Sequence, residues 1–184
     1  ARAADSDEPW TRHASGLLSA TPARALAPHE TWPPVAAVPV EIAGLYAAAE
    51  ARGLSYGPSF RGLLRVWQRG EELFADVELP DSEAGELRGW VLHPALLDAA
   101  LHPLFAISAD EPLQLPFSWT GVSAIAAGAA RLRVGMIRRP GSVALTLHDA
   151  RGEPLGRVDG LHLRPAQPAQ LSAAASRPIA DLYR

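Results

Sequence analysis

The amino-acid sequence predicts an α+β domain in which an antiparallel sheet wraps around one central helix. The first observation is a stretch of helix formers at 94–104 that is apolar almost all round, which indicates a buried helix. The second is a series of segments in which apolar and polar residues alternate, separated by short turns that contain glycine. Strands joined by such short turns pair antiparallel, so these segments predict one meandering sheet.

Length and composition are those of one globular domain. The chain has 184 residues, of which 48% are hydrophobic and 20% charged, and its formal net charge is −3. This charge gives no reason to expect binding to nucleic acid or to an anionic membrane. No run approaches the roughly 18 consecutive apolar residues of a membrane helix. The sequence has no cysteine for a disulfide, a thiolate zinc site or a nucleophile. We therefore expect a cytoplasmic protein.

The first 40 residues are predicted to form a strand and a linker. Residues 10–18 have the pattern of a short strand. Residues 19–40 hold many alanines and five prolines, which forbid a continuous helix and indicate a linker that lies over a surface. These prolines are Pro22, Pro28, Pro33, Pro34 and Pro39.

A helix and a tight turn follow the linker. Apolar residues recur at helical spacing within residues 41–52, and Gly53 can cap the end of that helix. Tyr56, Gly57 and Pro58 then form a turn whose glycine and proline fix the backbone. Such a turn can hold Tyr56 rigidly, although an ordinary turn with a packed aromatic residue would have the same sequence. The helical positions are Ile42, Leu45, Tyr46 and Ala49.

A hairpin precedes the central helix. Its strands are predicted at 62–69 and 72–79, with the turn at 69–71. The second strand alternates cleanly, so one of its faces belongs to the core. Residues 80–89 are acidic and predict a solvated loop. The core-facing residues of the second strand are Leu73, Ala75, Val77 and Leu79.

The sheet continues after the central helix. Pro112 and Pro116 bracket a turn before the next strand, and residues 149–152 form the turn before the last one. Residues 41–165 thus make one domain, and residues 166–184, rich in Pro, Ala, Ser and Gln, make a linker to a following domain. The four predicted strands comprise residues 117–125, 130–138, 142–149 and 155–164.

The central helix carries two polar side chains on one face. Pro94 suits its first turn, and Pro103 ends it. Asp98 and His102 lie four residues apart, so they can touch or share a ligand. Burial on so apolar a helix would raise the pKa of the Asp98 carboxyl, which suits a proton donor. Alternatively, Asp98 bonds a backbone N–H near the helix start, and His102 is a partly exposed residue near its end.

Four stretches carry a resemblance to a known family. His-Pro-Ala-Leu-Leu-Asp-Ala-Ala-Leu-His at 93–102 resembles the second catalytic motif of the dehydratase domains in modular type I polyketide synthases. Three further stretches agree in order with this family. They are Leu-Ser-Tyr-Gly-Pro-Ser-Phe at 54–60, Leu-Pro-Phe-Ser-Trp-Thr-Gly-Val at 115–122 and Leu-His-Leu-Arg-Pro at 161–165.

The resemblance implies a reaction and a set of site residues. Domains of this family remove water from a 3-hydroxyacyl thioester, which needs a base for the proton next to the carbonyl and an acid for the departing hydroxyl. Asp98 would be the acid and His102 its orienting neighbour, at a position where the family often has Gln. Tyr56 would be a second donor beside the substrate tunnel. The implied substrate-binding residues are Tyr56, Gly57, Pro58, His93 and Pro94.

The family also implies a double hot dog fold, of which this chain resembles the C-terminal half. Residues 1–18 would be the end strand of the first half, and residues 181–184 resemble the junction to the next domain. The family's base is a histidine in a His-x-x-x-Gly-x-x-x-x-Pro motif of the first half, and no such motif occurs here. The nearest imitation starts at His148 and continues to Gly152, but Arg157 stands where the proline should be. We therefore expect the acid without the base, and a chain that is inactive alone.

The implied partners follow from the parent enzyme. They are the missing first half, neighbouring synthase domains and an acyl carrier protein whose phosphopantetheine holds the substrate, in a homodimeric parent. No cofactor or metal is expected to bind directly, because His13, His29 and His162 share no metal-binding spacing. Four arginines could meet the acidic surface of a carrier protein, although solvated arginines on a strand would look the same. They are Arg131, Arg133, Arg138 and Arg139.

Two other functions fit the same sequence. The chain could be a non-catalytic remnant, in which the hot dog only supports neighbouring domains. Related domains with much the same residues also shift double bonds or close pyran rings. A His-x-x-x-Gly-x-x-x-x-Pro motif upstream of this chain would favour catalysis over the remnant, and product analysis would separate the three reactions.

Overall fold

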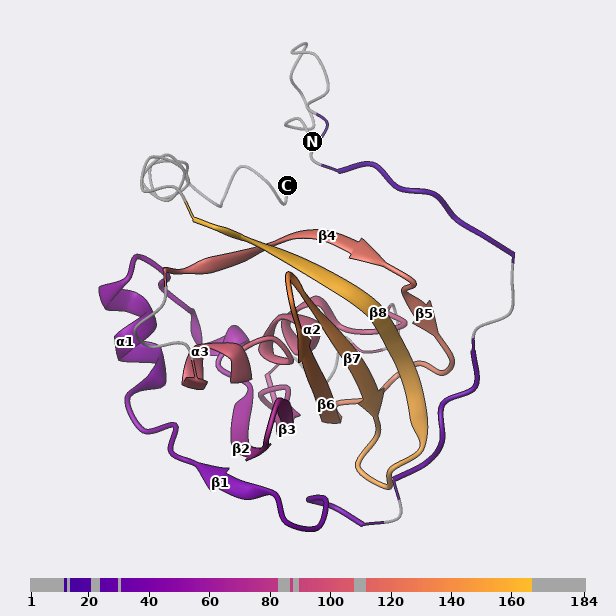
Figure 1. The fold of residues 1–184 in the computed structure, drawn as a ribbon, viewed down its shortest axis with the longest axis horizontal. Helices are drawn as coiled ribbons and strands as arrows, with labels where there is room; N and C mark the ends of the chain where they lie inside the picture. Colours follow the sequence, from indigo (N-terminus) through magenta and orange to yellow (C-terminus); the bar gives the residue numbers. More distant parts are fainter. Residues whose placement is uncertain are drawn as a thin grey trace. The chain divides into compact units, whose positions relative to one another are not determined.

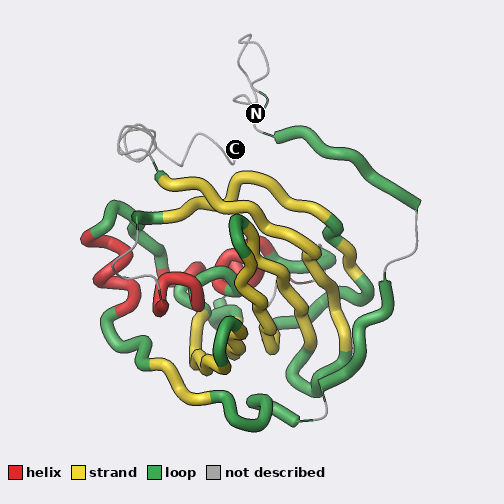
Figure 2. The backbone as a smooth tube through the Cα atoms, in the orientation of Figure 1, coloured by secondary structure: helices red, strands yellow, loops and turns green. Residues whose placement is uncertain are grey.

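The sheet curves around two short helices in the computed structural model (Figure 1; Figure 2). The structure describes residues 12, 14–20, 24–29, 31–82, 87, 90–107 and 112–166. The chain divides into a unit of residues 23–166, which holds every element described below, and a second unit of residues 1–22 with 167–184. The predicted α+β class and the sheet around a central helical segment are both present.

The sheet is antiparallel throughout. Its strands follow the order β1-β2-β3-β6-β7-β8-β4, with β5 paired to β8. The hairpin predicted around Gly70 and the meander of the last three strands are confirmed within one residue at most of their ends. The strands are β1 (Val38–Val40), β2 (Leu63–Arg69), β3 (Glu72–Glu78), β4 (Gln114–Thr120), β5 (Ser123–Ala124), β6 (Arg131–Arg139), β7 (Ser142–His148) and β8 (Pro154–Pro165).

The core lies between the concave face of the sheet and the helices. The inward face predicted for the strand at 72–79 is confirmed, because Leu73, Ala75 and Val77 of β3, and Leu79 just after it, are each at most 3% exposed. Alternating residues of β7 (Val143, Leu145 and Leu147) and Leu96 of the central segment belong to the same cluster. Period-two strands thus supply one wall of the core, and the helices supply the other.

The central helix is two helices rather than one. The helices are α1 (Leu45–Ala51), the 3-10 turn η1 (Pro58–Phe60), α2 (Pro94–Ala99) and α3 (Pro103–Ile107). The predicted end of α2 is caused by Pro103, which has no N–H for the carbonyl of Ala99 and would collide with it. That carbonyl accepts instead from the N–H of His102, at 3.2 Å. Pro103 then starts α3, which the sequence pattern did not predict.

The strand predicted at 117–125 was wrong in its limits. It starts three residues earlier and breaks at Gly121, whose φ of 58° lies in the left-handed region. Pro116 lies inside β4 instead of in a turn. An edge strand tolerates a proline, because an N–H that points away from the sheet has no hydrogen-bond partner to lose. The pairing of β4 with β8 is also irregular between Pro116 and Ser118.

The predicted strand at 10–18 is wrong for its described part. Residues 12 and 14–18 are assigned no strand. A strand without hydrogen-bonded neighbours does not persist, and its expected neighbours belong to the first half of a double hot dog. The membership of residues 1–18 in that half stays a prediction, and the predicted linker at 166–184 lies outside the described residues except for Ala166.

Within the predicted linker at 19–40, Ala27, His29 and Trp32 pack against the outer face of the sheet, and its last residues form β1. Trp32 donates its indole N–H to Asp76 at 2.7 Å, and its ring lies 5.9 Å from that of Phe74. His29 stacks on His148 with ring centroids 4.0 Å apart. The outer face of this sheet is therefore partly covered by its own chain.

This covered face predicts a pH-dependent stability. Burial lowers the pKa of both His29 and His148, and the neighbouring Arg133 guanidinium lowers both further. In the unfolded chain these rings bind protons at about pH 6.5, so as the pH falls below that value the unfolded state gains protons first and the folded state loses stability. We expect a lower melting temperature at about pH 5.5 than at about pH 7.5, by calorimetry.

Replacing both histidines by glutamine should remove most of that difference, because glutamine does not titrate. His162→Gln is the matched control, since His162 is exposed and should leave the pH dependence unchanged. An unaltered pH dependence in the double variant would rule out this pair as its source.

Candidate active site

The central segment is held against the sheet by close packing. Helix α2 begins at Pro94, and the side chain of His93 caps it by accepting from the N–H of Ala95 at 3.3 Å. Ala99 is fully buried, and a Cβ on Gly62 would come within 3.2 Å of its Cβ and 2.5 Å of a backbone carbonyl of the sheet. This close approach fixes the helix, and with it the direction of the side chain at position 98.

Asp98 and His102 form the contact that their spacing predicted. The Oδ2 of Asp98 lies 3.1 Å from the Nε2 of His102. The His102 side chain is 1% exposed, whereas 39% of the Asp98 side chain is exposed. The expectation of a deeply buried carboxyl was therefore wrong, because the Asp98 side chain lines a cavity. The alternative of a partly exposed His102 is also wrong.

Aromatic side chains surround the imidazole of His102. The hydroxyl of Tyr46 lies 3.1 Å from its Nδ1, and the Tyr56 ring centroid lies 4.5 Å from its own. Phe105 stacks on it at 5.6 Å. Burial raises the pKa of both tyrosine hydroxyls, and the nearby Asp98 carboxylate raises both further. Both tyrosines therefore keep their protons near neutral pH and can donate hydrogen bonds.

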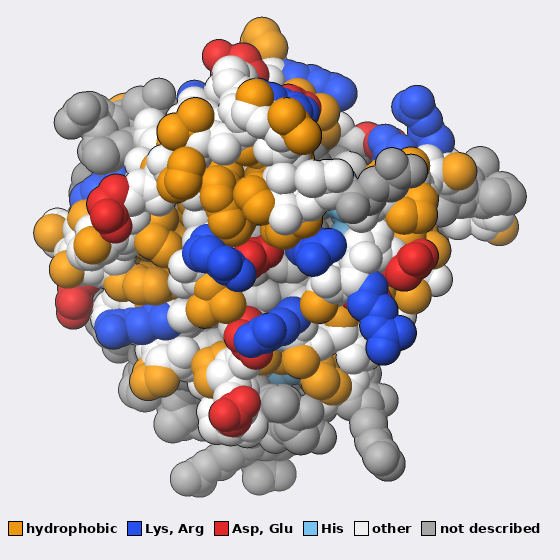
Figure 3. Space-filling view, turned by 90° about the horizontal axis from the view of Figure 1, so that it is seen from below, with side chains coloured by type: hydrophobic (Ala, Val, Ile, Leu, Met, Phe, Trp, Pro, Cys, Tyr) orange, Lys and Arg blue, Asp and Glu red, His pale blue; other side chains and the backbone are white. Residues whose placement is uncertain are grey.

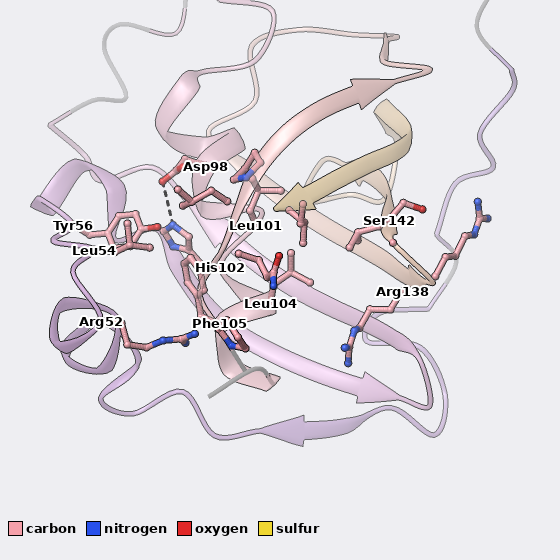
Figure 4. A pocket seen from close by; sticks show the side chains of 18 of the residues that line it. Arg52, Leu54, Tyr56, Asp98, Leu101, His102, Leu104, Phe105, Arg138 and Ser142 are labelled. Carbon is pink, nitrogen blue, oxygen red and sulfur yellow. Dashed lines mark hydrogen bonds and ion pairs between the residues drawn. The ribbon is translucent and has the colours of Figure 1, made fainter. Parts of the chain in front are cut away.

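A cavity of about 470 Å³ opens beside this group (Figure 4). Asp98, His102 and Tyr56 lie on one side of it, and apolar side chains such as Leu101 and Leu104 lie beside them. This volume falls within the range of small-molecule sites. A cavity with mostly apolar walls and one exposed carboxyl suits an acyl chain that carries a single polar group for reaction.

The other predicted substrate-binding residues lie elsewhere. Gly57, Pro58, His93 and Pro94 are not among the described residues that line the cavity. Gly57 and Pro58 precede and start η1, which packs on α2, and His93 and Pro94 form the start of α2. Their geometry fits a supporting role, in which they set the positions of Tyr56 and Asp98.

The four arginines considered for a carrier protein do not form one patch. Arg138 and Arg139 line the cavity at one end of β6. At the other end, Arg131 pairs with Glu78, and Arg133 lies over the ring of Trp32 at 5.7 Å. Figure 3 shows one face of the molecule, on which basic and acidic side chains lie beside one another and form no single basic patch.

The structure supports rejection of the imitation motif at His148. This side chain is 1% exposed on the outer face, where its Nε2 donates to the carbonyl of Ala27 at 2.9 Å. It does not line the cavity that holds Asp98 within the described part of the chain. In the same part, no three His, Cys, Asp or Glu side chains converge on a metal position, and no helix is long and apolar enough to cross a bilayer.

Sequence reasoning missed Tyr46. It was taken as one apolar position of the helix at 41–52, yet its hydroxyl reaches His102, 56 residues away. The available signal was its residue type, since a buried tyrosine usually needs a partner for its hydroxyl where phenylalanine or leucine would not. Arg52 and Phe105, which line the cavity, had no such signal.

Comparison with known proteins places this fold and cavity in a family. The model of the polyketide synthase dehydratase N-terminal domain matches residues 24–173. The chain belongs to the polyketide synthase dehydratase family. That description names an N-terminal domain, whereas the motifs at 54–60 and 93–102 resemble the second half, so the position of the chain within a double hot dog stays a prediction.

Relatives and solved structures of this family agree with the assignment. Over 178 residues the chain is 47% identical to the spectinabilin polyketide synthase system protein NorA′ of Streptomyces orinoci, covering 96% of this chain and 5% of that protein. A dehydratase structure for the borrelidin and fluvirucin polyketide synthases matches with a TM-score of 0.83 and 44% identity, over 88% of this chain and 59% of that one.

A further solved structure is a more distant match. The CurK dehydratase, in an inactive mutant with Asp replaced by Asn, matches with a TM-score of 0.67 and 25% identity, over 73% of this chain and 50% of that one. The hot dog fold implied by the resemblance is confirmed by these structures. The chain spans about half the length of the dehydratase structures it matches and a few per cent of the synthases.

Proposed function

We propose that this chain supplies the acid half of a dehydratase active site, which removes water from a 3-hydroxyacyl chain on an acyl carrier protein to give an enoyl thioester. The observation that carries the proposal is Asp98, whose carboxyl is exposed to a mostly apolar cavity and bound on one side to His102. Membership of the family supports this reaction.

The chemistry needs a base, which we place in the first half of a double hot dog. The base takes the proton next to the thioester carbonyl, and the electrons of that C–H bond form the new double bond. The C–O bond to the hydroxyl breaks at the same time, and the proton of Asp98 goes to the departing oxygen, so one water leaves. Each positioned proton transfer of this kind contributes about 10²- to 10⁴-fold to the rate.

Tyr56 supports the same step. It lines the cavity beside Asp98 and His102, and its raised pKa, caused mainly by burial, keeps the hydroxyl protonated. A neutral hydroxyl can donate a hydrogen bond to the substrate oxygen without competing as an acid. We assign it the role of a second donor that holds the leaving hydroxyl towards Asp98.

The carrier protein would approach at the end of the cavity where Arg138 and Arg139 lie. Their positive charge suits the acidic surface of an acyl carrier protein and the phosphate of its phosphopantetheine arm. Arg131 and Arg133 lie at the opposite end of the strand and are left out of this surface. Neighbouring synthase domains, a homodimeric parent and a cytoplasmic location stay predictions.

Turnover of a 3-hydroxyacyl pantetheine thioester tests the proposal. A protein that joins this chain to a first half carrying the base should form the enoyl thioester, whereas the 184-residue chain alone should form none. Mass spectrometry detects the loss of water, and NMR of the product distinguishes a double-bond shift or a pyran ring. Activity of the chain alone would show that it holds its own base. Inactivity of the joined, folded protein would favour the structural remnant.

A further inference from the structure

A hydrogen-bonded series connects the backbone of the sheet to the acid. The N–H of Leu63 donates to the hydroxyl oxygen of Tyr46 at 3.2 Å. The same hydroxyl lies 3.1 Å from Nδ1 of His102, and Nε2 of that ring lies 3.1 Å from Oδ2 of Asp98. Four residues from β2, α1 and the central segment thus form one line of donors and acceptors.

The direction of each bond is assigned from the groups available. A backbone N–H can only donate, so the Tyr46 oxygen accepts from Leu63. A hydroxyl oxygen can accept a second bond, but its own proton also needs an acceptor, and we assign that acceptor as the neighbouring Nδ1 of His102. Because Nδ1 accepts this hydrogen bond, it carries no hydrogen of its own in the neutral ring. The single ring proton is then on Nε2, which donates to Asp98.

We propose that Tyr46 is a positioning residue that holds His102 in its Nε2–H form and thereby places the acidic proton of Asp98 on Oδ1, the oxygen left for the substrate. The reason is that Oδ2 already accepts from the ring and so cannot carry the proton in that bond. With the opposite ring form, Nε2 would be an acceptor, and the Asp98 proton would be directed at the ring instead of at the departing hydroxyl. This rests on the proposed function of Asp98 as the acid.

The surroundings of Tyr46 fit this role. His102 is 1% exposed, so water does not offer its Nδ1 an alternative donor. Burial raises the pKa of the Tyr46 hydroxyl, which therefore stays a donor over the neutral range. The Arg61 guanidinium lies over the Tyr46 ring at 5.7 Å and confines it from the other side.

Glutamine at position 102 should preserve this arrangement. An amide has one acceptor oxygen and one donor nitrogen, so it can accept from Tyr46 and donate to Asp98 as the Nε2–H ring does. The amide thus reproduces the donor and acceptor pattern of the Nε2–H ring. Glutamate offers no donor, so His102→Glu should abolish the arrangement that His102→Gln preserves.

NMR of the ¹⁵N-labelled 184-residue chain tests the ring form directly, because the two nitrogens of a neutral imidazole differ strongly in shift. The chain provides its own references. His93 accepts at Nδ1 and His148 donates from Nε2, so both should show the Nε2–H form. His162 donates from Nδ1 to the carbonyl of Gly141 and should show the opposite form. We expect His102 to match His93 and His148 at neutral pH.

Two variants identify which neighbour sets the form. In Tyr46→Phe, the His102 signals should move towards the average of the two forms, while those of His148 stay in place. In Asp98→Asn, which keeps Tyr46, His102 should remain Nε2–H. A parent ring in the Nδ1–H or doubly protonated form would overturn the proposal. So would a Tyr46→Phe ring that stays fully Nε2–H, because Asp98 alone would then set it.

Turnover separates this proposal from the function it rests on. In the joined protein, Tyr46→Phe should lower kcat roughly tenfold, the effect of one hydrogen bond, with KM changed less than about twofold. A fully active Asp98→Asn protein would refute the acid role even if the NMR result holds. An active parent with the wrong ring form, or an unchanged kcat in Tyr46→Phe, would refute the role of Tyr46 alone.

Discussion

Replacing Asp98 by asparagine lowers the rate of dehydration by about 100-fold or more in a protein that joins this chain to a first half with the base. The amide keeps the shape of the side chain, and its oxygen can still accept from Nε2 of His102. It has no acidic proton to give to the departing hydroxyl. The loss should therefore appear in kcat, measured with a pantetheine thioester, and the melting temperature should hardly change.

His102→Gln is the matched control for this loss. It preserves the acceptor towards Tyr46 and the donor towards Asp98, so it should cost far less activity than Asp98→Asn. If Asp98 only stabilises the helix, Asp98→Asn should instead lower the melting temperature more than kcat. An active and well-folded Asp98→Asn protein would end the assignment of Asp98 as the acid.

The sequence was most informative where one residue type forces one geometry. The alternation of β3 and β7 put the right side chains in the core, because the period of two leaves no other inward face. Gly70 and the turn at 149–152 fixed the hairpins, where Asp149 accepts from the N–H groups of Arg151 and Glu153. These contacts join residues that are close in the sequence, so a short stretch of sequence is enough to predict them.

Errors arose where distant segments decide the outcome. Pro116 suggested a turn, but β4 is an edge strand whose pairing depends on β8, more than forty residues later. The central segment looked like one helix with a buried acid. Pro103 divides it, and the Asp98 side chain is partly exposed and lines the cavity. Neither outcome is visible within a helical or strand period.

The site shows the same division between local and distant causes. The contact of Asp98 with His102 followed from a spacing of four residues. The contact of His102 with Tyr46 spans 56 residues and depends on how α1 packs beside α3, which no local pattern encodes. Local sequence thus predicted the contact between Asp98 and His102, whereas tertiary packing supplies the contact with Tyr46, which we propose orients them.

Leu96 is the largest fully buried side chain of α2, the helix that carries Asp98. Leu96 is 0% exposed in the core cluster, and Leu97, the next residue of α2, is only partly buried. Truncating a fully buried leucine to alanine removes its apolar contacts and leaves a cavity, which costs about 2–5 kcal/mol. Against a total stability of about 5–15 kcal/mol for a domain, Leu96→Ala should strongly lower the urea midpoint.

Leu97→Ala tests whether burial, rather than helix composition, causes this loss. Both substitutions put the same residue type into the same helix, so their intrinsic helix propensities are equal. Because Leu97 keeps part of its surface in solvent, its truncation should cost roughly 1 kcal/mol. Equal losses of unfolding free energy in the two variants, at unchanged m-values, would show that α2 is not anchored through Leu96. In that case the fixed direction of the Asp98 side chain would need another cause, of which the close contact at Gly62 is the first to test.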